Sequence, residues 1–165
     1  MSSIKTKKLL KRATKIDLDK YIGEGKSEEK RTWKQVAAFP AWFQKDERGK
    51  PLQKVTATYT KKKGFVEVKN SGVESNGEKE TKIGKATTTS KPNVLKVKFS
   101  PIQPGADYII EFVDVDYKYA IVGSTGKAYL WILARGRVTQ DIYDQLISIA
   151  KRKGYEVDRL EKTKQ

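Results

Sequence analysis

Few side chains in this sequence of 165 residues can carry covalent or proton-transfer chemistry. The chain has no Cys and no His, which excludes thiol nucleophiles, thiolate metal sites, serine–histidine catalysis and histidine metal ligands. The acids nearest the expected interior are Glu111 and Asp114, and strand alternation turns Glu111 outward. The sequence therefore predicts a protein that is not an enzyme, and it predicts neither a metal site nor a cofactor.

Aromatic and apolar side chains at alternate positions predict binding instead. Where such positions face one interior, they form a pocket for an elongated apolar ligand, with tyrosine hydroxyls to meet a polar headgroup. Gly84 and Ala86 are small and are expected to leave room inside. Further inward positions are Ala37, Val66, Val68 and Leu133. The ligand-binding candidates are Phe39, Trp42, Phe43, Val55, Ala57, Tyr59, Leu95, Val97, Tyr108, Ile110, Phe112, Tyr129 and Trp131.

Two alternatives stay open at this point. The same alternation suits a small barrel whose interior is packed solid with side chains, because periodicity does not separate a core from a cavity. The aromatic loop around Pro40, which holds Phe39, Trp42 and Phe43, suits either a hydrophobic plug on the rim or a lip that gates a ligand and touches a membrane.

The elements that must position these residues are short strands. Eight segments of strand character follow one another at short spacing and only one helix is expected, at Thr139 to Lys153, with Thr139 as its cap and Gly154 after its end. This order predicts an all-β protein: an eight-stranded antiparallel up-and-down β-barrel with one C-terminal α-helix packed outside. The expected strands are 33–37, 52–60, 65–70, 81–88, 95–99, 108–114, 119–122 and 129–134.

The sequence predicts a short N-terminal arm, one barrel domain and a polar insertion near the start of that domain. Residues 1–15 are basic and are expected to form a flexible arm, whereas 16–162 form a single barrel domain that includes the helix 139–153. Residues 24–31 form a polar insertion.

The net charge is +15, from 35 basic and 20 acidic side chains. Such a field attracts anionic lipid surfaces, nucleic acid or acidic proteins. No apolar run approaches the roughly 20 residues that span a bilayer, and the N-terminal residues lack the apolar core of a signal peptide. We therefore expect a cytoplasmic protein, either free or peripheral to a membrane.

Residues 116–122, DYKYAIV, and 129–135, YLWILAR, resemble the second and third conserved motifs of the lipocalins. Residues 16–23 resemble the short first turn of that family, and Trp33 resembles its first-strand tryptophan, although Arg31 stands where the family has glycine. Within the family, the sequence resembles the branch of bacterial outer-membrane lipocalin, apolipoprotein D and the plant temperature-induced lipocalins.

The resemblance implies the predicted barrel and a stack of Arg135 on Trp33 at its closed end, which Asp116 and Tyr117 brace. It also implies binding of a fatty acid, a lysophospholipid or a similar lipid, for storage, transport, membrane maintenance or a stress response. The expected partners are such a ligand and an anionic membrane surface, with the protein a monomer or a dimer. The alternative is a basic barrel that binds nucleic acid or an anionic surface and has no cavity ligand. Nucleic acid is disfavoured because the aromatic residues alternate inward.

Overall fold

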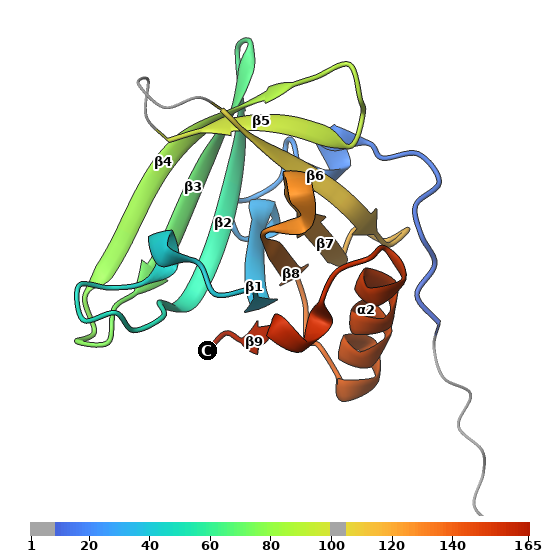
Figure 1. The fold of residues 1–165 in the computed structure, drawn as a ribbon. Coiled ribbons are helices and arrows are strands. Elements are labelled where there is room, and N and C mark those ends of the chain that lie inside the picture. Colours follow the sequence, from blue (N-terminus) through green and yellow to red (C-terminus); the bar gives the residue numbers. More distant parts are fainter. Residues whose placement is uncertain (1–8, 100–104) are drawn as a thin grey trace, which may run out of the picture.

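The computed structural model describes residues 9–99 and 105–165. Consecutive antiparallel strands form one sheet, and β1 pairs with both β8 and β2, which closes the sheet into a barrel (Figure 1). The predicted eight-stranded barrel is thereby confirmed. Its strands are β1 (Thr32–Ala38), β2 (Gln53–Lys62), β3 (Phe65–Val73), β4 (Lys79–Thr88), β5 (Val94–Lys98), β6 (Ala106–Val113), β7 (Tyr119–Gly123) and β8 (Leu130–Ala134).

The helical segments and one additional strand lie around this barrel. A two-residue strand, β9 (Glu161–Lys162), pairs with the end of β1. Among the described residues, the α-helices are α1 (Leu18–Ile22) and α2 (Gln140–Arg152), and the short 3-10 turns are η1 (Glu29–Arg31), η2 (Trp42–Gln44), η3 (Thr125–Lys127) and η4 (Val157–Arg159). No helix in the described part of the chain is long and apolar enough to cross a membrane.

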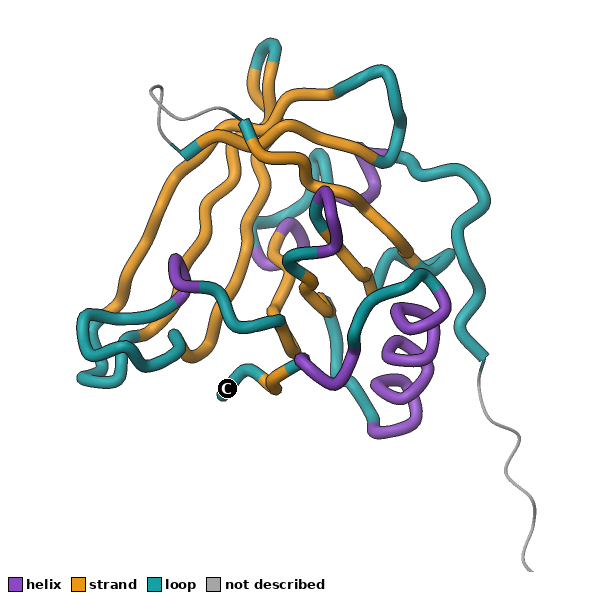
Figure 2. The backbone as a smooth tube through the Cα atoms, in the orientation of Figure 1, coloured by secondary structure: helices purple, strands orange, loops and turns teal. Residues whose placement is uncertain are grey.

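The expected C-terminal helix is present and packs outside the barrel, as Figure 2 shows. The Thr139 hydroxyl accepts a hydrogen bond from the Ile142 N–H at 3.2 Å and so caps α2. Ile142, Leu146 and Ala150 form its buried face, because residues three to four apart lie on one side of a helix.

Buried apolar side chains form two clusters, one on each side of the sheet. The interior cluster includes Tyr21, Trp33, Tyr59 and Val122. The outer cluster lies between the barrel wall and α2, and it includes Phe39, Phe112, Ile121, Ile132 and Leu146. Strand alternation explains this division, because successive side chains of one strand point to opposite faces.

Two β-bulges move residues from the interior to the outer cluster. The pairing register shifts between Gln35 and Ala37 in β1 and between Ile110 and Phe112 in β6. An extra residue at a bulge changes which face the following side chains occupy. The expectation that Ala37 and Phe112 face the interior is therefore wrong, since both pack in the outer cluster.

The N-terminal arm is only partly covered by the structure. Residues 1–8 lie outside the described residues. Residues 9–15 hold to the barrel: the Leu10 N–H donates to Gln145 Oε1 at 2.9 Å, and the Ala13 N–H donates to the Val113 carbonyl at 2.9 Å. Backbone hydrogen bonds thus hold residues 9–15 against the wall, and the flexibility expected of residues 1–15 stays a prediction.

The polar insertion at 24–31 folds back onto the barrel. Arg31 carries the main contacts, donating through Nη1 to the Tyr59 carbonyl at 2.9 Å and to Thr60 Oγ1 at 2.5 Å. Gly23, which precedes the insertion, has φ 73°, and a Cβ there would lie 2.7 Å from the Lys30 carbonyl oxygen. A glycine is therefore required where the chain turns into this segment.

Candidate ligand-binding cavity

A cavity of about 410 Å³ occupies the barrel interior. Its lining is mainly apolar, and it reaches the surface near Trp42, Lys82 and Phe99. Trp42 is 75% exposed and Phe99 is 41% exposed, so aromatic side chains border the opening. The interior is consequently not packed solid with side chains.

Eight of the thirteen expected ligand-binding residues line this cavity. They come from η2 and from strands β2, β5, β6 and β8, and they are Trp42, Phe43, Val55, Ala57, Tyr59, Val97, Tyr108 and Trp131. These residues converge from five elements far apart in the sequence, so most of the expected ligand-binding residues share one cavity.

The other five candidates lie elsewhere. Leu95 and Ile110 are buried in the interior cluster but do not line the cavity. Phe39 and Phe112 belong to the outer cluster. Tyr129 lies beside the opening, with its ring 5.1 Å from that of Phe43 and 6.0 Å from that of Trp131, centre to centre. Tyr129 thus supports two lining residues without lining the cavity itself.

Polar lining residues are the main group that the sequence reasoning missed. They include Gln35, Gln44, Asn70, Glu80 and Lys82. Asn70 pairs with Lys82 across β3 and β4, and both continue the inward alternation of Val68 and Gly84. Extending that alternation past the apolar residues would have located them.

Gly84 does not leave the space that was expected of it. A Cβ added there would lie 2.7 Å from the Phe99 ring, so the aromatic side chain occupies the room that the glycine leaves. Phe99 lines the cavity as a result.

A pair of amides fixes the η2 loop over the cavity. Gln35 Nε2 donates to Gln44 Oε1 at 3.2 Å, and Gln44 Nε2 donates to Gln35 Oε1 at 3.1 Å. Gln35 Nε2 also donates to Thr163 Oγ1 at 2.9 Å. The C-terminal tail, β1 and η2 therefore meet at one polar contact beside the opening.

The loop after η2 is held through Asp46, which is buried. Its carboxylate accepts hydrogen bonds from the Ser75 hydroxyl and from the Ser75, Lys50 and Arg48 N–H groups, at 2.5 to 3.0 Å. These donors, Ser75 foremost, hold the pKa of the Asp46 carboxyl well below its usual range. The β3–β4 turn and the η2 loop are joined at this carboxylate.

The opposite end of the cavity has a polar floor of three tyrosines, Tyr21, Tyr59 and Tyr108. The Tyr108 hydroxyl forms a hydrogen bond with the Tyr59 hydroxyl at 2.7 Å and a second, shorter one with the Tyr21 hydroxyl. Tyr59 and Tyr108 line the cavity. Burial raises the pKa of all three hydroxyls, so they are neutral at physiological pH.

Arg135 and Trp33 close the barrel beneath this floor. The Arg135 guanidinium carbon lies 4.0 Å from the centre of the Trp33 ring, so the expected contact is present. Arg135 donates to the Tyr117 carbonyl at 3.0 Å and to the Tyr21 carbonyl, and the Trp33 indole N–H also donates to the Tyr21 carbonyl, at 2.9 Å. Burial lowers the pKa of Arg135 below its ordinary value.

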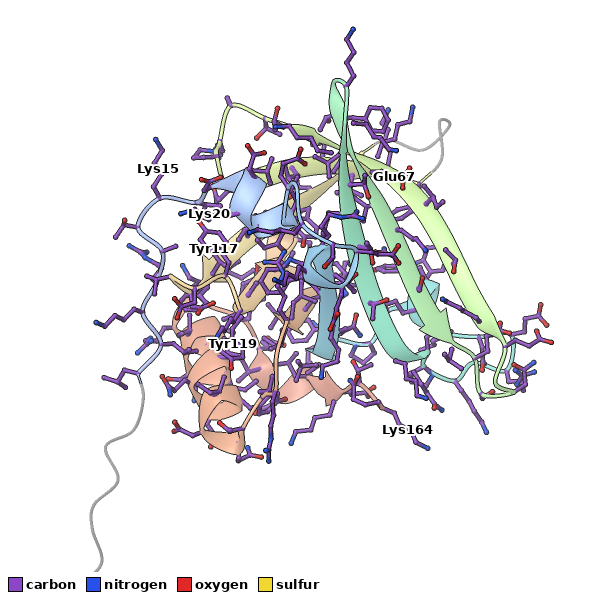
Figure 3. All side chains as sticks on the ribbon, turned by 180° about the vertical axis from the view of Figure 1, so that it is seen from behind. Lys15, Lys20, Glu67, Tyr117, Tyr119 and Lys164 are labelled. Carbon is purple, nitrogen blue, oxygen red and sulfur yellow. The ribbon has the colours of Figure 1, made fainter. Side chains whose placement is uncertain are left out.

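Of the two residues expected to brace the closed end, Tyr117 does so, whereas Asp114 takes the place of Asp116. Tyr117, labelled in Figure 3 together with Lys20, accepts a hydrogen bond from the Asp17 N–H at 2.9 Å through its hydroxyl. Asp116 is exposed. The buried Asp114 carboxylate holds the turn instead, accepting from the Lys118 and Tyr119 N–H groups at 2.7 and 2.8 Å.

Comparison with known proteins agrees with this geometry. A family model described as a lipocalin-like domain matches residues 16–165. Temperature-induced lipocalin-1 of Arabidopsis thaliana is 34% identical over 161 residues, covering 91% of this chain and 80% of that protein. Outer membrane lipoprotein Blc of Escherichia coli K12 is 33% identical over 150 residues, covering 87% of this chain and 76% of that protein.

Solved structures share the fold at lower identity. Lobster apocrustacyanin A1 superimposes with a TM-score of 0.66 at 16% identity, covering 98% of this chain and 93% of that one. Insecticyanin from the tobacco hornworm Manduca sexta superimposes with a TM-score of 0.64 at 19% identity, covering 96% and 85%. At such identities the likeness concerns the fold alone.

Proposed function

Because the chain belongs to the lipocalin family, whose members bind small hydrophobic ligands, we propose that it binds a single fatty acid or lysophospholipid for storage, transport or membrane maintenance. The observation that carries this proposal is the open, mainly apolar cavity of about 410 Å³ inside a closed barrel. That volume lies within the range of pockets that enclose small molecules, about 300 to 1,000 Å³.

The energetics of a hydrocarbon chain in this cavity are favourable. Burying about ten methylenes contributes roughly 8 kcal/mol, at ~0.8 kcal/mol each. Micromolar affinity corresponds to about 8 kcal/mol, and the cost of immobilising the ligand lowers the net value. Ten methylenes alone therefore give an affinity weaker than micromolar, and each further methylene that packs against Val55, Ala57 or Trp131 adds about 0.8 kcal/mol.

Titration with a fluorescent fatty acid and a fluorescent lysophospholipid tests this proposal. We expect saturable binding at one site per chain. Ala57→Phe places a ring in the cavity and is expected to weaken binding at least about tenfold, whereas Ile83→Phe makes a similar change on an exposed position of β4 and is expected to have no effect. No saturable binding below roughly 100 μM, where Kd corresponds to only about 5 kcal/mol, would contradict the proposal.

We also infer that the protein contacts anionic membranes through the opening of the cavity. Two observations support this contact: the exposed Trp42 beside the opening, since tryptophan favours membrane interfaces, and the net charge of +15. A ligand would then pass between bilayer and cavity without crossing water. The cytoplasmic location expected from the sequence stays a prediction.

A further inference from the structure

The tyrosine floor of the cavity has unused hydrogen-bonding capacity. Three hydroxyls carry three hydrogens, and each oxygen can also accept. Two hydrogen bonds, Tyr21 with Tyr108 and Tyr59 with Tyr108, join them and consume two of the three hydrogens. The remaining hydrogen is on Tyr108 when Tyr108 accepts both bonds, on Tyr59 when Tyr21 donates to Tyr108 and Tyr108 donates to Tyr59, and on Tyr21 in the reverse order. In the first two arrangements it belongs to a residue that lines the cavity.

The charge below the floor favours an electron-rich group above it. The Arg135 guanidinium lies directly beneath the floor, where it donates to the Tyr21 carbonyl and lies over the Trp33 ring that stacks on Tyr21. Its hydrogen-bond acceptors are carbonyl oxygens of Lys20, Tyr21 and Tyr117. Within residues 9–99 and 105–165, no ion pair involves Arg135. In a site of low dielectric constant, this cation attracts negative charge and oxygen lone pairs more strongly than it does in water.

We propose that this floor binds an oxygen atom at the leading end of the ligand, so that the cavity selects apolar molecules whose buried end is polar. The inference rests on the proposed function, which it makes more specific. A buried apolar methyl end leaves the third hydroxyl hydrogen without a partner, whereas a hydroxyl, keto or carboxyl oxygen accepts it. The site is therefore built for a chain or ring system that enters oxygen first.

This orientation distinguishes the two ligand classes proposed above. A fatty acid can enter carboxyl first and place an oxygen on Tyr59 or Tyr108. A lysophospholipid that enters by its acyl chain brings a methyl group to the floor and gains no hydrogen bond there. Long-chain alcohols and compact molecules with a hydroxyl or keto group at one end fit the floor equally well.

Binding of matched ligands tests this orientation. We would measure displacement of a fluorescent fatty acid by 1-dodecanol, by dodecanoate and by tridecane, which replaces the hydroxyl of dodecanol with a methyl group. Each affinity is taken as the ratio of variant to wild type for the same ligand, so that differences in ligand solubility cancel. Tyr108→Phe removes the central hydroxyl and keeps the ring.

We expect Tyr108→Phe to weaken binding of the oxygen-bearing ligands about 3- to 10-fold, the range of one net hydrogen bond, and to leave tridecane unchanged. Tyr143→Phe is the matched control, since Tyr143 lies on α2 outside the barrel and does not line the cavity, so its variant should bind all three ligands normally. Tyr59→Phe should reproduce the effect if Tyr108→Phe proves too unstable to measure.

The outcomes distinguish failure of the polar floor from failure of lipid binding as a whole. A loss with dodecanol, with dodecanoate or with both supports the polar floor and says whether a neutral or a charged oxygen is accepted. Equal ratios for all ligands in both floor variants would overturn the floor while leaving lipid binding intact. Failure of the wild-type protein to bind any ligand would overturn the proposed function itself.

Discussion

The guanidinium of Arg135 joins three segments at the closed end of the barrel. It lies over the Trp33 ring from β1, donates to the Tyr117 carbonyl between β6 and β7, and donates to the Tyr21 carbonyl at the end of α1. A cation over an indole contributes about 0.5–2 kcal/mol, and hydrogen bonds from a charged donor contribute about 1.5–3 kcal/mol each. A single side chain thus stabilises both the floor of the cavity and the turns around it.

Arg135→Ala should lower the free energy of unfolding by about 2–4 kcal/mol, because it removes the stacking contact and the charged donor to the Lys20, Tyr21 and Tyr117 carbonyls. Urea unfolding measures this loss. Arg137→Ala, two residues further along at an exposed position, is the control and should change stability by less than about 0.5 kcal/mol. Equal stability of the two variants would contradict the role given to Arg135.

At the scale of elements, most strands could be predicted from alternation, and the bulges could not. In β6, Tyr108 and Ile110 face inward as expected, whereas Phe112 faces α2 because the register shifts after Ile110. A bulge adds one residue to one strand relative to its partner, and that partner is known only once the sheet is formed. Ile109 and Ile110 are both apolar, as are Phe112 and Val113, so the residue types around Phe112 do not mark the shift.

At the candidate site, some residue contacts could likewise be predicted from the sequence and others could not. Trp33 and Arg135 stand in motifs that the sequence displays, so their contact could be predicted. The turn after β6 offers both Asp114 and Asp116, and only the backbone geometry decides that Asp114 accepts the hydrogen bonds. Asn70 and Lys82 lie in the same alternation as the apolar lining residues, but their polar side chains carry no sign in the sequence that they face an apolar interior.

Packing of α2 on the outer wall is independent of the cavity. Leu146 is fully buried in the outer cluster, so Leu146→Ala should lower the free energy of unfolding by about 2–5 kcal/mol through the cavity that it creates. Ligand affinity, measured well below the melting temperature, should stay within about twofold of wild type, since Leu146 does not line the binding cavity. A tenfold loss of affinity would show that the two sides of the wall are coupled.

The loop that follows η2 should respond to acid through Asp46. Its folded-state pKa lies below the ordinary value of 3.8, so its stabilising hydrogen bonds are fully present above that value and are lost as the pH falls through the folded-state pKa. Urea unfolding from pH 6 to pH 3 should therefore show a steeper loss of stability in the wild type than in Asp46→Asn. Asp116→Asn, at an exposed position, should follow the wild-type curve, and identical curves for all three would contradict this role.

At the scale of the whole molecule, charge and shape act together. In the proposed membrane contact, the net charge of +15 supplies an attraction to anionic lipid that salt limits to distances of about 10 Å at 0.1 M. The charge alone does not orient the molecule. Exposed aromatic side chains beside the cavity, Trp42 and Phe99, provide an apolar contact at one place on the surface, and this contact determines which end would face a bilayer.

Vesicle binding should therefore depend both on salt and on Trp42. Co-sedimentation with vesicles of phosphatidylserine and phosphatidylcholine should fall about tenfold between 0.1 M and 1 M salt, as the screening length shrinks to about 3 Å. Trp42→Ala should weaken binding at both salt concentrations, because the loss is apolar, whereas Ile83→Ala removes an exposed apolar residue of β4 and should not. Equal binding of the two variants would mean that charge alone holds the protein to the surface, without a preferred end.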